Sequence, residues 1–205
     1  MAVWERGAKC MPKIEAENIE QHIRRQTNRI LDAAVELFSE RGYRSTDMND
    51  IAGRIGLARN SLYRYYANKD HILLACVQRD MAPFLQQVRD LESSLPEPRA
   101  RIDAWIDLQM QIATGPCRAT MEMIGEIREA SPNFRREIRA LHEPPARVLE
   151  AAIAELVGGT DRDAKLLAAM THSMVQSAAA QAIARGELAE ICSELKRAIA
   201  RILEE

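Results

Sequence analysis

The sequence predicts an all-α protein of about nine helices, and three observations support this fold class. Apolar residues recur at intervals of three and four along almost the whole chain, which is the spacing of one helix face. The strict apolar–polar alternation of a half-buried strand is absent. Proline and glycine residues divide the pattern into segments of helical length.

The first predicted helix runs from about residue 12 to residue 41 and ends at Gly42, since glycine commonly follows the last helical turn. Its apolar stripe consists of Ile23, Ile30, Ala34, Leu37 and Phe38. Ser45 and Thr46 offer hydroxyl caps for a short second helix over residues 47–54.

Two short helices around Gly56 form the most specific pattern in the chain. Gly56 predicts a tight turn, because a residue without Cβ tolerates a positive φ angle. A third helix follows over residues 59–65, and Asn68 is placed to cap a fourth that starts near Lys69. The expected inward-facing residues are Ile51, Ala52, Ile55, Leu57, Leu62 and Tyr65. This pattern predicts a helix-turn-helix rather than an ordinary helix pair in a bundle.

The segment after residue 93 breaks the helical pattern, and five further helices are predicted beyond it. The first ends near residue 114, and the others cover about residues 117–130, 133–157, 161–185 and 188–205. Pro144 and Pro145 lie inside the seventh helix of the chain, where they remove two backbone donors. We therefore expect a kink or a split there.

Charge is distributed unevenly, although the net charge of the whole chain is only −2. Residues 21–69 contain nine Arg and Lys residues against five Asp and Glu residues, so this segment is basic and the rest is acidic. A basic module joined to an acidic one directs attention to nucleic acid as a partner of the basic module.

The stretch "RILDAAVELFSERGYRSTDMNDIAGRIGLARNSLYRYYANKDHIL" resembles the DNA-binding domain of the TetR (tetracycline-repressor-like) family of bacterial transcriptional regulators. The matching marks are "IL-AA--LF-E-GY--T", "IA---G", "LY-YY" and "KD--L". The resemblance implies an all-helical homodimer with an N-terminal three-helix DNA-binding domain. It also implies a C-terminal domain that dimerises and usually binds a small ligand. We accordingly expect an N-terminal extension over residues 1–20, a helix-turn-helix domain over 21–68 and a ligand-binding and dimerisation domain over 69–205.

The third helix is expected to enter the DNA major groove with its N-terminal residues nearest the bases. Arg59 suits guanine O6 and N7, and Asn60 suits adenine N6 and N7. Ser61 and Arg64 are candidates for contacts with bases or phosphates. Phosphate candidates from the resemblance are Thr46, Tyr63 and Lys69, and further basic candidates, with solvated surface charge as the alternative, are Arg24, Arg25 and Arg44.

The other tyrosines and Ala58 complete the predicted interface. Tyr65 has two open interpretations, core packing or a phosphate contact, whereas Tyr66 and Tyr43 are expected to pack. Ala58 stands where the family commonly has Ser or Thr. An alanine cannot accept from the first free N–H groups of the helix, a loss of roughly 1 kcal/mol. We infer an altered operator from Ala58 followed by Asn60.

The C-terminal part is rich in methionine, which lines adaptable surfaces but also fills ordinary bundle cores. We expect an apolar ligand pocket among the fourth to eighth helices. Its candidate residues are Trp105, Gln109, Met121, His142, Met170 and Met174. A buried carboxylate there, from Glu122 or Glu126, would favour a cationic lipophilic ligand.

The last two helices are the expected dimer interface, with an intramolecular core as the alternative for the same apolar stripes. The candidate interface residues are His172, Gln176, Ala180, Ile191, Leu195 and Ile199. The resemblance implies that two such helices from each subunit pair in a four-helix bundle.

Other functional classes lack their signatures in this sequence. No Gly-rich phosphate loop, metal-ligand cluster or nucleophile–base pairing is recognisable, so we expect no enzyme, no cofactor and no bound metal. No run of 18 apolar residues and no secretory signal occurs, and the four cysteines are widely spaced. These features favour a cytoplasmic protein without a membrane partner.

The leading hypothesis is a homodimeric repressor that binds a palindromic double-stranded DNA operator and is released by a small lipophilic effector. The alternative is an activator or a ligand-independent DNA-binding regulator. Repressor and activator share every residue discussed above, so the sequence leaves this choice open.

Overall fold

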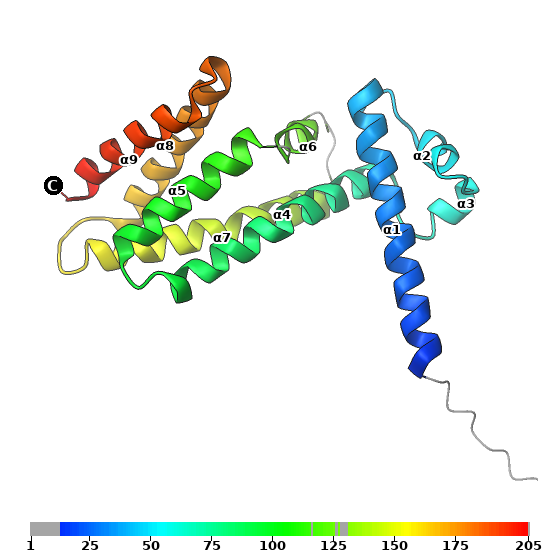
Figure 1. Cartoon of the computed structure of the whole chain (residues 1–205), viewed down its shortest axis with the longest axis horizontal. Coiled ribbons are helices and arrows are strands. Elements are labelled where there is room, and N and C mark those ends of the chain that lie inside the picture. The colour runs from blue at the N-terminus through cyan, green and yellow to red at the C-terminus, as the bar shows by residue number, and fades with distance from the viewer. Residues whose placement is uncertain (1–12, 116, 126, 128–130, 205) are drawn as a thin grey trace, which may run out of the picture. The chain divides into compact units, whose positions relative to one another are not determined.

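The computed structural model describes residues 13–115, 117–125, 127 and 131–204, with side chains from residue 18 onward. Within these residues the chain forms nine α-helices and no β-strand, which confirms the all-α prediction (Figure 1). The helices are α1 (Lys13–Arg41), α2 (Met48–Arg54), α3 (Arg59–Leu62), α4 (Lys69–Ser94), α5 (Pro98–Thr114), α6 (Cys117–Ile124), α7 (Pro132–Leu156), α8 (Ala164–Arg185) and α9 (Leu188–Glu204).

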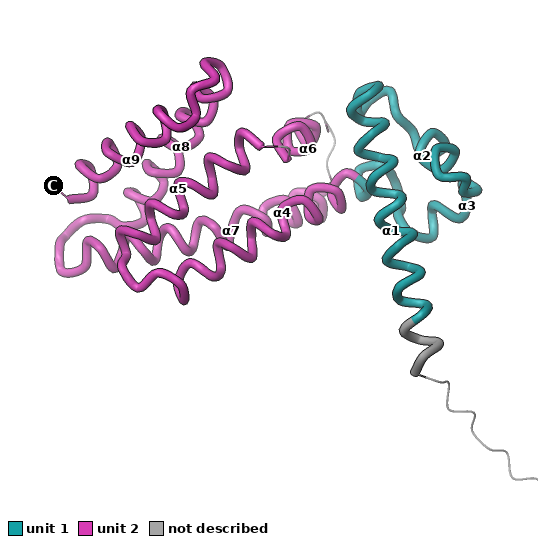
Figure 2. The backbone as a smooth tube through the Cα atoms, in the orientation of Figure 1, with its two compact units in different colours: residues 1–72 teal, residues 73–205 magenta. Residues whose placement is uncertain are grey.

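The chain divides into two compact units, which we call unit 1 (residues 1–72) and unit 2 (residues 73–205) (Figure 2). The division falls inside α4, after Ile72, whereas the sequence placed a domain boundary before Lys69. The expected N-terminal extension is helical from Lys13 onward, so residues 13–20 extend α1. Residues 1–12 lie outside the described residues, and with them the alternative of a basic arm.

Unit 1 has a small core formed where α2 contacts both α1 and α3. Its most deeply buried side chains are Ile30, Ala34, Leu37, Phe38, Ile51, Leu62 and Ile72. Ile23 was expected in the same stripe, but 48% of its surface is exposed. The reason is visible at Arg29, whose guanidinium donates to the carbonyl of Ile55 at 3.0 Å. The turn after α2 thus meets α1 near residue 29, and Ile23 lies nearly two turns before this contact.

The turns of unit 1 follow the predicted glycines, but the cap of α2 differs from the prediction. Gly42 and Gly56 adopt φ angles of +83° and +69°, which L-residues with a side chain rarely adopt. Asp47 caps α2 by accepting from the N–H groups of Asn49 and Asp50 at 2.7 and 2.9 Å. Prediction of Ser45 or Thr46 as the cap was therefore wrong. Asn68 does cap α4, since its side chain accepts from the His71 N–H at 3.0 Å.

Three helices are shorter than predicted. The α3 helix ends at Leu62 because the following N–H groups of Arg64 and Tyr65 bond to carbonyls only three residues back. The α6 helix ends at Ile124, and Gly125 follows in a turn. The α8 helix begins at Ala164, where Asp163 caps it.

Unit 2 is built around α5, which contacts α6, α7, α8 and α9. Its central buried side chains include Ile102, Trp105, Ile106, Met110, Leu149, Ile153 and Ile199. The α7 helix continues through Pro144 and Pro145, so the predicted split does not occur. The carbonyl of Pro145 accepts from the indole N–H of Trp105 at 2.8 Å, which ties α5 to α7.

None of the described helices combines the length and apolar character needed to cross a membrane. The described residues also contain no group of three or more His, Cys, Asp or Glu side chains arranged to hold a metal ion.

Candidate functional site

The N-terminal turn of α3 presents a polar, basic surface in unit 1. Arg59, Asn60 and Arg64 are exposed, and Ser61 is half-buried. Leu62, on the opposite side of the same short helix, is fully buried and anchors it. Ala58 stands at the N-cap without a side-chain hydrogen bond, as the sequence predicted. The N–H of Ser61 instead donates to the Ala58 carbonyl at 2.9 Å.

Arg59 and Tyr63 form a pair on this surface. The guanidinium donates to the Tyr63 hydroxyl at 3.1 Å, and its carbon lies 5.5 Å from the centre of the Tyr63 ring. The hydrogen bond that Arg59 donates to Tyr63 is the main cause that raises the pKa of Arg59, with a smaller contribution from Asp47. Tyr63 is 41% exposed, so its hydroxyl accepts from Arg59 and retains its own proton for donation to a further acceptor.

Three acidic side chains in or beside α2 form ion pairs with arginines. Arg54 pairs with Glu36 at 3.1 Å and with Glu40 at 2.7 Å. Its hydrogen bond is the main cause that lowers the pKa of Glu40. Arg41 pairs with Asp50 at 3.5 Å. The two arginines offset two of these three negative charges, which weakens the acidic field beside the exposed Arg59 and Arg64.

Lys69, which we predicted at a phosphate, has its ammonium group directed inward. It donates to the carbonyl oxygens of Tyr43, Arg44 and Thr46 at 2.8, 3.4 and 2.9 Å. The nitrogen also lies 4.4 Å from the centre of the Tyr43 ring. Because an ammonium group has three donors, these carbonyls account for all of them. The structure therefore supports a structural role for Lys69 instead of the predicted phosphate contact.

Thr46 is likewise turned away from solvent, with 1% of its surface exposed. Its hydroxyl donates to the carbonyl oxygens of Leu37 and Gly42 at 3.3 and 3.0 Å. These bonds hold the loop after α1, and they leave the Thr46 side chain unable to reach a phosphate without local opening. The prediction of this side chain as a phosphate ligand is thus not supported.

The remaining predicted interface residues divide by exposure. Arg24, Arg25 and Arg44 are exposed. Tyr65 is half-buried, which leaves both of its interpretations open. Tyr43 is buried and its ring lies 5.3 Å from that of Phe38, as expected for a packing residue.

Unit 2 contains a cavity of about 290 Å³ to which α4, α5, α6, α7 and α8 all contribute side chains. Its floor is apolar and buried, and consists mainly of Met81, Phe84, Leu141, Val175 and Ala179. Its polar lining residues are Gln109, Arg118, Glu122, His142, His172 and Gln176. Most of the polar group is partly or largely exposed, so the cavity has an apolar floor and a polar rim.

The polar rim has no net fixed charge at neutral pH. Arg118 and Glu122 form an ion pair at 2.6 Å, and both imidazoles are largely neutral because burial lowers the pKa of His142 and of His172. A smaller cause for His172 is repulsion by a protonated His142. The amide of Gln176 lies 3.3 Å from the His172 ring. This cavity suits a small amphiphilic molecule.

Comparison with known proteins agrees with the helix-turn-helix of unit 1. Residues 30–76 match the family described as bacterial regulatory proteins, tetR family. The HTH-type transcriptional repressor KstR of Mycobacterium tuberculosis is 25% identical over 179 residues, covering 87% of this chain and 68% of that protein. The fatty acid metabolism regulator protein of Bacillus subtilis is 23% identical over 126 residues, covering 62% of this chain and 65% of that protein.

A solved structure shares the fold of the described chain. It is the transcriptional regulator FadR from Bacillus subtilis in complex with stearoyl-CoA, with a TM-score of 0.64 and 18% identity, covering 85% of this chain and 96% of that one. Residues 30–76 therefore carry the DNA-binding domain of the TetR family of transcriptional regulators.

Only part of the predicted ligand set lines the cavity of unit 2. Gln109, Met121 and His142 line it, as predicted. Trp105 does not, because its ring is 1% exposed within the core of unit 2. Met170 is 45% exposed on the outer face of α8, and Met174 lines a different surface. Glu122 lines the cavity but is paired with Arg118, and Glu126 lies outside the described residues.

The predicted dimer residues also separate. His172 and Gln176 line the cavity, and Leu195 and Ile199 are 7% and 0% exposed inside unit 2. The intramolecular alternative therefore holds for the α9 stripe. The residues that sequence reasoning missed at the cavity are Arg118, His172 and Gln176. The helix that carries each of these residues was predicted, but whether its side chain faces the cavity depends on how α6 and α8 pack.

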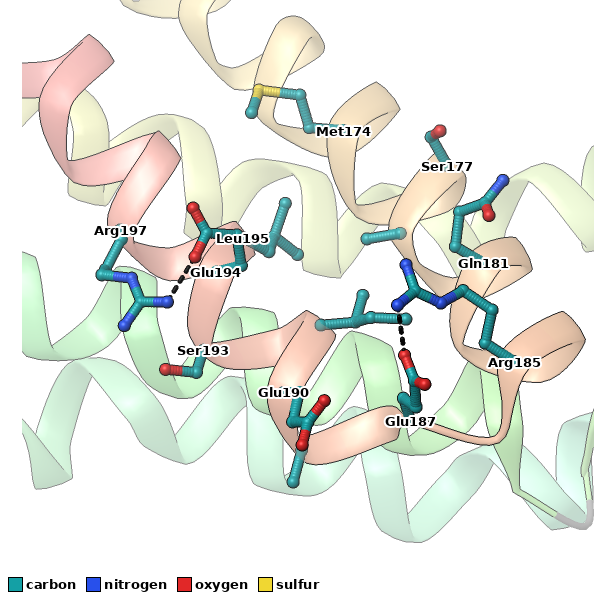
Figure 3. A pocket seen from close by; sticks show the side chains of 13 residues that line it. Met174, Ser177, Gln181, Arg185, Glu187, Glu190, Ser193, Glu194, Leu195 and Arg197 are labelled. Carbon is teal, nitrogen blue, oxygen red and sulfur yellow. Dashed lines mark hydrogen bonds and ion pairs between the residues drawn. The ribbon is translucent and has the colours of Figure 1, made fainter.

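A second, open depression of about 900 Å³ lies along α8 and α9. Figure 3 shows Met174, Ser177 and Gln181 on α8 and Glu190 and Glu194 on α9 among the side chains that line it. Ala180 is exposed on α8, and Ile191 is half-buried on α9. The exposed large apolar side chains around this end of unit 2 are Leu166, Met170, Ile183 and Leu188.

Proposed function

We propose that this protein is a homodimeric repressor of the TetR family that binds a palindromic DNA operator through α3 and is released by a small amphiphilic ligand. The observation that carries the proposal is that Arg59 and Asn60 are exposed in the first turn of α3, a helix whose opposite side is buried. Both residue types form bidentate contacts with base edges in the major groove. Helix-turn-helix recognition places base-contacting residues at this end of the helix.

The Arg59–Tyr63 pair supports DNA binding by preorganisation. A guanidinium held by a hydroxyl and an aromatic face loses less rotamer freedom on binding than a free one. The Tyr63 hydroxyl can donate to a phosphate while it accepts from Arg59. One pair would then join a base contact to a backbone contact.

The cavity in unit 2 supports regulation by a ligand. It lies in the unit that carries none of the proposed DNA contacts, so any effect on DNA must pass through the protein as a differential affinity for two states. The KstR relative is a repressor by name, and the FadR structure holds stearoyl-CoA, which favours a ligand-released repressor here as well.

The apolar face of α8 supports a dimer. Leu166 and Met170 lie one turn apart on the same face of α8 and are 57% and 45% exposed, so they form an apolar patch that a partner would bury. Two copies related by a two-fold axis would present two α3 helices to the two halves of a palindrome. Sedimentation of the full chain, with Met170→Glu as the disrupting variant, measures this directly.

The test of DNA binding is selection of genomic fragments by the full chain, followed by fluorescence anisotropy on the recovered fragment. Arg59→Ala should weaken binding by about 1–3 kcal/mol at its site, roughly tenfold to a hundredfold. Arg139→Ala, an exposed arginine on α7 in unit 2, is the matched control and should bind as the wild type does. Equal affinities of the two variants would remove Arg59 from the interface.

A reporter fused to the promoter beside the recovered fragment separates repressor from activator. Higher expression after deletion of the regulator gene supports repression. Lower expression supports the alternative, in which the same surface binds DNA to activate transcription.

A further inference from the structure

We propose that the unit 2 cavity binds a short-chain or medium-chain aliphatic carboxylate, with its carboxylate at the His142–His172 rim, and that binding takes up a proton. This inference rests on the proposed ligand-binding role of the cavity and specifies the class of ligand. It follows from the size of the cavity, the position of its polar groups and their charge.

The size of the cavity limits the length of the ligand. A cavity of about 290 Å³ is small for a ligand site and favours a small ligand. The value lies at the lower end of the range for small-molecule sites. An eight-carbon acid fills it, whereas a long acyl thioester of a nucleotide carrier exceeds it several-fold.

The distribution of polarity fixes the orientation of the ligand. Met81, Phe84 and Val175 are all at most 6% exposed, and they form a floor that offers no hydrogen-bond partner to a polar head. The rim residues Gln109 and Gln176 carry amides on α5 and α8. An alkyl chain therefore enters first, and the head group stays at the rim near solvent.

The rim carries more donors than a neutral head group uses. Two amides and two imidazoles supply at least four N–H donors, which matches the four lone-pair sites of a carboxylate. A hydroxyl head group would accept from at most two of these N–H donors and leave the others to water. The rim thus favours a carboxylate over an alcohol of the same length.

The charges that face the cavity disfavour a cationic ligand. The charged or titratable lining groups are Arg118 and Glu122 on α6, His142 on α7 and His172 on α8, and the lining residues of α4 and α5 carry none. Glu122 is held by Arg118 at 2.6 Å and is largely exposed, so no free carboxylate awaits a cation. An anion, by contrast, is neutralised when one of the imidazoles protonates.

Proton uptake follows from the two charge states of the rim. In the free protein the pKa values of His142 and His172 are lowered, chiefly by burial, so both rings are largely neutral at pH 7. A bound carboxylate favours the protonated ring and raises its pKa. Between the free and bound pKa values the complex binds more protons than its parts, so affinity falls as pH rises through that window.

Titration calorimetry of the full chain with octanoate and with 1-octanol tests the inference. Experiments at pH 7 in two buffers of different ionisation enthalpy measure the protons taken up. We expect uptake with octanoate, none with 1-octanol, and octanoate affinity roughly threefold to sixfold higher at pH 6 than at pH 8, for a shift of about one pKa unit on binding. His142→Gln/His172→Gln should abolish uptake, and His22→Gln, exposed on α1, should leave it unchanged.

Three results would overturn the inference: no octanoate binding, tighter binding of 1-octanol, or octanoate binding without proton uptake. The wild-type buffer comparison keeps the test valid even if the double variant fails to fold. A parallel arm adds each probe to the protein–DNA complex. Octanoate that binds with uptake but leaves DNA bound confirms the ligand class and contradicts release. DNA release by 1-octanol alone contradicts the ligand class and retains release.

Discussion

The two candidate sites of this regulator are built in opposite ways. The α3 surface of unit 1 is formed by neighbours in sequence, Arg59 to Arg64, and its functional side chains point away from a small core. The cavity of unit 2 draws side chains from five helices, from Met81 to Ala179. Local geometry defines the first site, and tertiary packing defines the second.

Because of this difference, substitutions at the α3 surface should affect function without affecting stability, whereas substitutions around the cavity of unit 2 should affect both. Arg59 and Asn60 contact solvent, so their removal should change the free energy of unfolding by no more than about 0.5 kcal/mol. The wall behind the cavity is core, and Trp105 lies 6.0 Å, ring centre to ring centre, from the cavity residue His172. A change in that core therefore alters both the fold and the cavity.

The largest expected effect is that of Trp105→Ala. Loss of a fully buried indole and of its bond to the Pro145 carbonyl should lower the free energy of unfolding by about 3–5 kcal/mol. Urea unfolding followed by circular dichroism measures it, with Trp105→Phe as the milder control. A loss below about 1 kcal/mol would mean that the core of unit 2 is not organised around this side chain.

The variant Lys69→Met tests the structural role of Lys69 in unit 1. Removal of a charged donor from three carbonyls should lower the free energy of unfolding by about 1.5–3 kcal/mol. Arg64→Ala, an exposed change on the α3 surface, should instead reduce the salt dependence of DNA affinity with little effect on stability. If the Lys69 variant lowers the salt slope and keeps its stability, Lys69 binds phosphate after all.

Ala58→Ser tests the missing cap of α3. A serine hydroxyl accepts from the N–H groups of the first turn, and we expect a gain of about 0.5–1 kcal/mol in the free energy of unfolding. Ala58→Gly should gain somewhat less, because glycine at an N-cap is a few tenths of a kcal/mol less favourable than serine. No gain with the serine variant would show that these groups are already satisfied.

The smallest expected effect is the pH dependence of unit 2. The pKa values of His142 and His172 are lowered in the folded chain, so the unfolded chain binds more protons below about pH 6.5. Stability should therefore fall as pH drops from 7 towards 5, although solvent at the rim screens the effect. Melting temperatures of the wild type and of His142→Gln/His172→Gln should converge at pH 7 and diverge at pH 5. Parallel curves would contradict the shifted pKa values.

The same contrast explains what the sequence could predict. The glycines at 42 and 56, the exposed Arg59 and the uncapped Ala58 follow from short-range patterns, and all appear in the structure. The sequence could not predict that Lys69 and Thr46 bond to backbone carbonyls, because these carbonyls come from residues such as Tyr43 and Leu37 that only the fold brings close. Exposure of a polar side chain is a tertiary property that spacing does not contain.

The cavity shows the same limit more strongly. Helix periodicity placed Gln109, Met121 and His142 correctly, but it assigned His172 and Gln176 to a dimer surface and Met174 to the cavity. These last three residues all lie on α8, within one and a half turns of each other. Successive residues of a helix are rotated by about 100° about its axis, so close neighbours on α8 can face either the cavity or the depression along α8 and α9. Only the packing of α8 against α5 and α7 determines which residues face the cavity.

Selection from a randomised DNA duplex library by the wild type and by Asn60→Ala tests the central claim, DNA recognition by α3, most directly. We predict one palindromic motif for the wild type. The variant should select the same motif with relaxed preference at one position in each half, a change of about 1–3 kcal/mol in discrimination there. Identical motifs from both proteins, or no enriched motif from the wild type, would contradict the claim.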